Sequence, residues 1–146
     1  MRTAVRRLRK QLGRRGHFLV IIGGGETCYG LSLLVDPPTA QGLGLLTHWC
    51  SLRHWSWLWI LCGLVTGLSA LLRVGRDWGG FLAALVPPTV WATAYTAAVV
   101  SGQYSRGAYV ALWYLTSHVG VILWAAEVPE YSVPHAPRSA RKGGSP

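Results

Sequence analysis

The chain has 146 residues, of which 51% are hydrophobic and 13% are charged, and its formal net charge is +9. Its apolar residues form long uninterrupted blocks and not the spaced stripe of a surface helix, which excludes an ordinary water-soluble helical domain. In a soluble protein this charge would suggest nucleic-acid binding. Here the basic residues gather at the ends of the chain and in short gaps, so membrane topology explains them first.

Residues 1–16 form a basic arm before the first apolar block. Val5, Leu8 and Leu12 share one face of a predicted amphipathic helix, and basic residues surround them. We expect the arm to lie in the cytoplasm on the anionic inner leaflet, where each nearby basic side chain contributes about 1 kcal/mol. Nucleic-acid binding is the alternative, but a membrane anchor follows directly and no nucleic acid is expected. The residues expected at the lipid surface are Arg6, Arg7, Arg9, Lys10, Arg14 and Arg15.

Four stretches of the chain are long and apolar enough to cross a bilayer, for which about 20 residues are needed and roughly 17 are the lower limit. They cover approximately residues 17–35, 55–72, 79–101 and 107–126. The sequence therefore predicts an all-α integral membrane bundle of four transmembrane helices over residues 17–126. Residues 127–146 contain four prolines and scattered charges, and we expect a disordered cytoplasmic tail there.

The basic residues predict how the four spans are oriented. If all four cross, seven Lys and Arg of the arm, two in the gap before residue 79 and three in the tail fall on one side, while only Arg53 and Arg106 fall on the other. Lys and Arg accumulate on the cytoplasmic side of a membrane. We therefore expect both termini in the cytoplasm and the protein in the bacterial inner membrane, with the lipid bilayer as its partner.

The first outer loop, residues 36–54, begins with a proline pair at positions 37 and 38 that ends the first span. Leu45, Leu46, Trp49 and Leu52 fall on one helical face, so we expect a short helix lying in the outer membrane interface. A second proline pair, at positions 87 and 88, lies inside the third span. It is expected to kink or locally break that helix.

Glu26 is the one carboxylate within a predicted span, about nine residues or roughly 13 Å from its inner end. His118 lies at a similar depth in the fourth span, and one interpretation is an intramembrane pair between the two side chains. An ionisable residue in a membrane is by default a functional candidate, because its burial costs a few kcal/mol and it needs a partner or a water-filled cavity. The alternative is a structural role in which Glu26 is protonated, or hydrogen-bonded to a neighbouring Thr or His.

Gly63 and Gly67 form a GxxxG pattern in the second span, which lets helix backbones approach closely. The pattern indicates close helix packing and, less specifically, a homo-oligomer. The sequence contains no paired carboxylates, no HExxH and no phosphate-binding loop, and its three cysteines lack metal-ligand spacing. We therefore expect no enzyme, no bound metal and no cofactor.

Several short motifs resemble a group of small four-span membrane proteins encoded by actinobacterial phages and prophages. They are GLGLL at residues 42–46, WLWI at 57–60, CGL at 62–64, RDWGGF at 76–81, Tyr95, and Glu127 with Pro129. The resemblance covers residues from about 14 to 130. It implies a phage product in the host inner membrane, in a group of unsettled activity with some holin-like members. Glu26 and the proline pair at 87 and 88 do not map onto that group.

Three functions remain open from the sequence. The first is a holin-like or lysis-associated protein, in which oligomerising helices open or depolarise the inner membrane. The second is a small proton- or cation-coupled transporter that uses Glu26, although the long basic arm and the long outer loop are unlike compact exporters. The third is an accessory or structural membrane protein without transport activity, such as an anchor or a superinfection-exclusion factor.

Overall fold

The computed structural model describes residues 13–39, 41–72 and 75–128, and all regular structure in these ranges is helical. The basic arm up to residue 12 and the tail from residue 129 lie outside the described residues. The helices are α2 (Arg14–Val35), α3 (Gly44–Trp49), α4 (Leu52–Ser69), α5 (Trp78–Val100) and a last long helix made of α6 (Gly107–Trp113), the π-helical segment η1 (Tyr114–Gly120) and α7 (Val121–Glu127).

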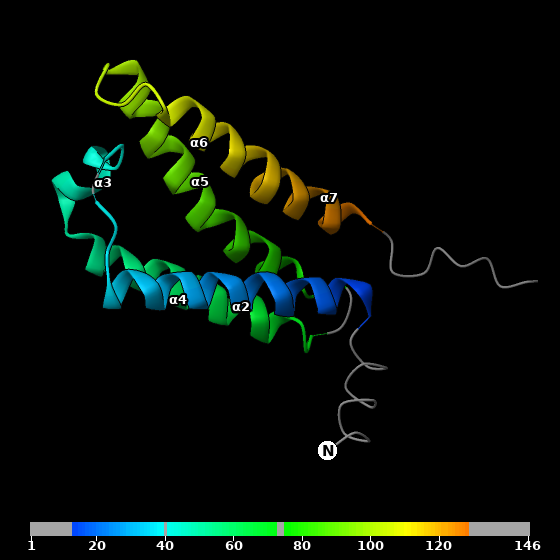
Figure 1. Cartoon of the computed structure of the whole chain (residues 1–146). Coiled ribbons are helices and arrows are strands. Elements are labelled where there is room, and N and C mark those ends of the chain that lie inside the picture. Colours follow the sequence, from blue (N-terminus) through cyan, green and yellow to red (C-terminus); the bar gives the residue numbers. More distant parts are fainter. Residues whose placement is uncertain (1–12, 40, 73–74, 129–146) are drawn as a thin grey trace, which may run out of the picture.

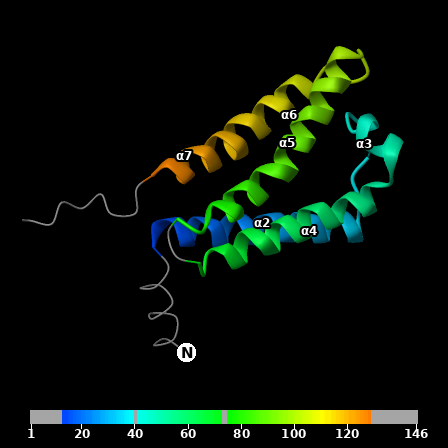
Figure 2. The same cartoon turned by 180° about the vertical axis from the view of Figure 1, so that it is seen from behind.

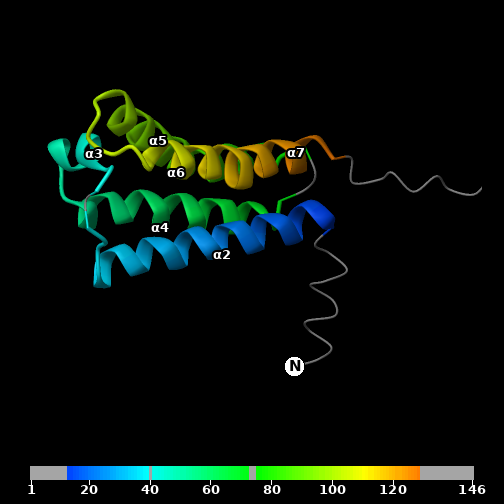
Figure 3. The same ribbon diagram turned by 45° about the horizontal axis from the view of Figure 1, so that its top comes forward.

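The long helices form two antiparallel pairs. Figures 1 and 2 show α2 beside α4, and α5 beside the helix made of α6, η1 and α7. The pairs meet near the start of α5 and separate toward the opposite end, where α3 lies between them (Figure 1). In the turned view of Figure 3 the axes of the long helices are nearly aligned, although the chain runs along successive helices in opposite directions. The start of α2 and the end of α7 lie at one end, which we call the terminal end. The end with α3 is the loop end.

Three helices are long and apolar enough to cross a membrane: Arg14–Val35, Trp78–Val100 and Gly107–Glu127. They match the first, third and fourth predicted spans to within a few residues. The second predicted span corresponds to α4, which is not among them. α4 has 18 residues, begins with Arg53 and His54 in its first turn, and ends at Ser69 and not at residue 72 as predicted.

The α2–α4 interface is built on direct backbone contact. A Cβ atom added to Gly23 would lie 2.5 Å from both the carbonyl oxygen of Gly63 and the backbone nitrogen of Gly67. One added to Gly30, two turns further along α2, would lie 2.8 Å from the backbone nitrogen of Ile60. These spaces exclude any side chain, so glycine lets the two helices approach at van der Waals distance.

Two apolar clusters lie on either side of a polar layer. The cluster toward the loop end contains Leu33, Leu43, Leu46, Leu52, Trp59, Trp91, Ala92, Ala94 and Tyr114. The cluster toward the terminal end contains Leu19, Ala70, Phe81, Ala84, Ile122 and Ala125. Glu26, Thr66, Pro87 and Pro88, all buried, fall between the clusters along their helices, and so does His118 between Tyr114 and Ile122.

Two local expectations differ from the structure. The predicted outer-loop helix ends at Trp49, and Leu52 belongs to α4, because Cys50 and Ser51 adopt extended backbone between them. α5 continues through Pro87 and Pro88 without a break. Both prolines are buried among neighbouring helices, and packing of this kind tolerates proline in a membrane helix.

The glycine contact predicts a position-specific loss of stability. We expect Gly63→Ala to lower the free energy of unfolding by about 1–3 kcal/mol, because its Cβ would overlap the α2 backbone at Gly23 and Thr27. The matched control is Gly24→Ala, where a Cβ meets open space and helix propensity improves. Thermal unfolding in detergent measures both, and equal midpoints for the two variants would contradict the interface.

Candidate functional site

Glu26 lies in the polar layer and has no hydrogen-bond partner. Its side chain is only 4% exposed, and neither carboxylate oxygen accepts a hydrogen bond from the described residues. Thr66 of α4 and Cys62, one turn before it, are the polar neighbours close enough to influence the carboxyl group. The Thr66 hydroxyl instead donates to the carbonyl oxygen of Gly80 on α5, at 3.2 Å. The carboxyl group is therefore enclosed in the α2–α4 interface, where the neighbouring Thr66 hydroxyl compensates it only in part.

A carboxyl group buried in a helical interface with so little compensation has a limited chemistry. An ionised carboxylate costs several kcal/mol when it is removed from water, so a buried one takes up a proton or binds a cation. Neither state needs a covalent step or a cofactor. The site can therefore exchange a proton or a small cation, or hold one permanently as a structural feature.

His118 is at the same layer but is not joined to Glu26. Its Nδ1 atom lies 2.9 Å from the Ser117 hydroxyl, and its ring centroid lies 4.8 Å from that of Trp113 and 5.3 Å from that of Tyr114. No hydrogen bond to Glu26 is formed from either side within the described part of the chain. The expected pair is therefore not formed among the described residues.

The π-helical segment η1 around His118 was not expected from the sequence. Thr116 donates its hydroxyl to the carbonyl oxygen of Leu112 at 2.8 Å, and Ser117 donates to that of Trp113 at 2.5 Å. Hydroxyl groups that bond back to the preceding turn compete with the α-helical hydrogen bonds and bend helices. The consecutive Thr-Ser, with Gly120 soon after, is the sequence signal that could have indicated it. Such wide turns are frequent at functional sites.

Aromatic side chains connect the helices on the loop side of the polar layer. The ring centroids of Tyr29 and Trp59 are 4.6 Å apart, and those of Trp59 and Trp91 are 5.2 Å apart. Tyr95 stacks on Tyr114 at 6.2 Å. The indole N–H groups of Trp59 and Trp91 are buried without an acceptor among the described residues. These aromatic contacts join all four long helices, and the two indole N–H groups within them have no acceptor among the described residues.

Arg15 holds the terminal end together. Its Nε atom lies 2.8 Å from Oδ2 of Asp77, its Nη1 atom donates to the carbonyl oxygen of Ala126 at 2.6 Å, and its guanidinium lies 4.7 Å from the centre of the Phe81 ring. The side chains of Arg15 and Asp77 are only 15% and 5% exposed. The structure therefore corrects the placement of Arg15, which was expected at the lipid surface. Sequence reasoning also missed Asp77, the single acidic residue in an otherwise basic gap.

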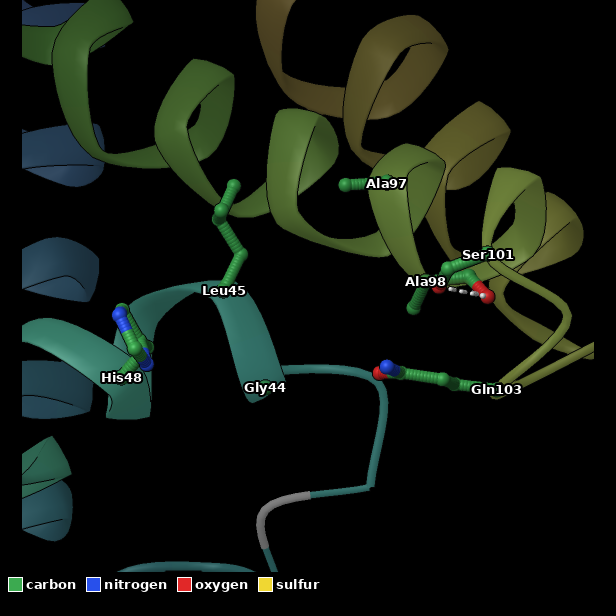
Figure 4. Close-up of a pocket in the computed structure, with 7 residues that line it drawn as sticks. All are labelled: Gly44, Leu45, His48, Ala97, Ala98, Ser101 and Gln103. Atoms are coloured by element: carbon green, nitrogen blue, oxygen red, sulfur yellow. Dashed lines mark hydrogen bonds between the residues drawn. The ribbon is translucent and has the colours of Figure 1, made fainter.

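A cavity at the loop end separates α3 from α5. Its volume is about 360 Å³, and Figure 4 shows Gly44, Leu45 and His48 of α3 facing Ala97, Ala98, Ser101 and Gln103. The Ser101 hydroxyl bonds to the carbonyl oxygen of Ala98 at 3.2 Å, so it is already occupied. Neither at this cavity nor elsewhere in the described ranges is a group of three His, Cys, Asp or Glu side chains placed to hold a metal ion.

No protein-family model matches this chain, and comparison with curated proteins and with solved structures finds no similar protein.

The Arg15–Asp77 contact predicts a stability loss when one partner is neutralised. We expect Asp77→Asn to cost about 1–3 kcal/mol, less than a fully buried pair, because Arg15 keeps some exposure to solvent. The double variant Arg15→Gln/Asp77→Asn should lose less than the sum of the two single variants. Asp36→Asn, at an exposed position that forms no ion pair with the described residues, is the matched control in thermal unfolding. Strict additivity would show that the two side chains act independently.

Proposed function

We propose that this chain is a multi-pass protein of the bacterial inner membrane that crosses it four times, with both termini in the cytoplasm. Three helices have the length and apolarity for crossing. The fourth, α4, rises about 27 Å over its 18 residues, close to the roughly 30 Å of a hydrocarbon core. Its charged Arg53 lies at the loop end, where a long side chain reaches the interface. The start of α2 and the end of α7 lie at the same end of the bundle, which agrees with an even number of crossings.

The proposed topology predicts the behaviour of reporter fusions. Alkaline phosphatase fused after Thr39 or Gln103 should be active, because both positions lie in loops assigned to the outside. Phosphatase fusions after Gly75 or Val128 should be inactive, and green fluorescent protein fused at the same two positions should fluoresce, because it matures in the cytoplasm. Opposite locations for residues before α2 and after α7 would mean that α4 does not cross, and would overturn the four-span proposal.

We propose, for activity, a holin-like role in which copies of the protein assemble and depolarise the inner membrane. The observation that carries it is a groove of about 430 Å³ on the outer face of α5. The lining residues are Thr89, Ala92, Thr93, Thr96, Ala97, Val100 and Leu115. Thr89, Thr93 and Thr96 are exposed along one side of this helix.

The groove is suited to contact between membrane helices. Hydrocarbon does not drive apolar helices together, so association depends on small residues that permit close packing and on hydroxyl groups that can bond across the contact. The hydroxyls of Thr89 and Thr93 bond to their own helix at 2.7 and 2.8 Å, which satisfies them in the single copy. In an assembly the same face supplies both a packing surface and hydroxyl groups for a hydrated lining. The sequence resemblance to small phage membrane proteins supports a lysis-associated role.

A second candidate is proton- or cation-coupled transport, which the burial of Glu26 favours. Its unpartnered carboxyl group lies inside the helical interface and not on the lipid face. Intramembrane carboxyl groups of this kind mark ion pathways in many transport proteins. An accessory protein without transport activity is the outcome if neither candidate is supported.

Inducible expression with a potential-sensitive dye tests the holin-like proposal. The wild-type chain should stop growth and depolarise the membrane, and Thr93→Leu should delay or abolish this by replacing a hydroxyl in the groove with a bulky side chain. The matched control is Ser32→Leu, at an exposed serine of α2 whose hydroxyl also bonds back to its own helix, at 2.7 Å, and which lies outside the groove. Equal effects of the two variants would show that the α5 groove has no special role.

In that experiment Glu26→Gln distinguishes the second candidate. The holin-like proposal expects depolarisation to persist in this variant, since the groove is unchanged. Transport predicts instead that the wild-type chain confers cation resistance or proton-coupled uptake, and that Glu26→Gln removes it while membrane insertion stays normal. A wild-type chain inactive in both measurements would support the accessory role.

A further inference from the structure

A second inter-helix cavity opens at the terminal end, between the start of α2 and the end of α7. Its volume is about 230 Å³. The lining residues are Arg14, Arg15, Phe18, Trp124, Ala125 and Val128. Since one water molecule occupies about 30 Å³ of liquid, the cavity can hold a group several times larger than water. Neither the holin-like proposal nor the Glu26 site uses it.

The two arginines of the cavity have different roles. Arg15 is held by Asp77 and by the carbonyl oxygen of Ala126, so it forms a fixed wall. Arg14 is exposed and forms no hydrogen bond or ion pair with the described residues, so its guanidinium remains available at the rim. None of the described residues that line the cavity is a carboxylate. The charge that an incoming group meets is therefore positive.

The remaining walls are apolar. Phe18 stacks on Phe81 at a ring separation of 6.0 Å, which holds it in place, and Ala125 is buried against the bundle. Trp124 is 68% exposed on the outer face of α7. A tryptophan at this position is typical of the headgroup level of a membrane, where its ring is apolar and its N–H can donate a hydrogen bond.

We propose that this cavity binds the phosphate group of an anionic phospholipid, with Arg14 as the recognising charge and Phe18, Trp124 and Ala125 contacting the upper acyl chain. Basic pockets between membrane helices on the cytoplasmic side bind anionic headgroups in this manner. The Arg14 guanidinium can form two parallel hydrogen bonds with a phosphate. The inference rests on the proposed placement of the terminal end at the cytoplasmic surface.

Native mass spectrometry of the full chain in detergent tests the site by titration with phosphatidylglycerol. We expect one tight phosphatidylglycerol molecule per chain, weaker binding of phosphatidylcholine with the same acyl chains, and no comparable binding of inorganic phosphate. Arg14→Gln should weaken phosphatidylglycerol binding about fivefold, the equivalent of about 1 kcal/mol. Arg76→Gln removes the same charge from an exposed position at the terminal end that is not among the described residues lining the cavity, and should leave the affinity unchanged.

A second variant tests whether the shape of the cavity, and not only its charge, contributes to binding. Val128→Trp narrows the cavity and keeps both arginines, so it should also weaken binding of phosphatidylglycerol. Equal losses from Arg14→Gln and Arg76→Gln would assign binding to the general positive charge of the terminal end and overturn the site. Equal affinity for inorganic phosphate would show a simple anion site. Because binding is measured on purified protein, it can fail while the reporter fusions support four spans, and the reverse also holds.

Discussion

The contact between α2 and α4 at Gly23, Gly63 and Gly67 is the constraint on which the rest of the structure depends. It brings two helix backbones to van der Waals distance and therefore fixes which face of α2 is enclosed. Glu26 lies on that same face, between Gly23 and Gly30 at the three- and four-residue spacing of a helix. The carboxyl group is thus directed into the bundle and cannot turn to the lipid or to water. Its burial is a consequence of glycine packing. Because neither carboxylate oxygen accepts a hydrogen bond from the described residues, Glu26 is the first candidate for a functional residue.

The two helix pairs are held together differently at their two ends. At the terminal end Arg15 connects α2, Asp77 before α5 and the last carbonyl groups of α7 through a charged network. At the loop end the pairs diverge, α3 fills the space, and aromatic rings make the contact. The groove of α5 and the cavity at the terminal end lie where these contacts leave the helices uncovered.

The sequence was sufficient for the helical class and for the places where three long apolar helices run, because these follow from composition over about 20 residues. It also singled out Glu26, since a carboxylate within an apolar block is conspicuous. It could not separate Arg14 from Arg15. These neighbours have the same chemistry, and the 100° rotation between adjacent helical positions decides that one is enclosed and the other is exposed. The partner that distinguishes them, Asp77, is 62 residues away.

The same limit explains the other differences. A proline pair inside a span indicates a break when read locally, yet buried packing around Pro87 and Pro88 keeps α5 continuous. The relation between Glu26 and His118 required the lateral arrangement of the helices, and matching depth along two spans does not provide it. The π-helical turn depends on a choice between hydrogen bonds that differ by little energy, for which Thr116 and Ser117 gave only a weak indication.

The pairing of helices that are neighbours along the chain has a consequence for biosynthesis. The α2–α4 hairpin closes through its own glycines and Thr27, and the residues of this contact have all been synthesised before α5 begins. A nascent chain can therefore complete its first hairpin while the second is still in the ribosome, since N-terminal units assemble first during translation. The carboxyl group of Glu26 then meets α5 only as the second hairpin docks, and Arg15 secures the finished arrangement last, once Ala126 arrives.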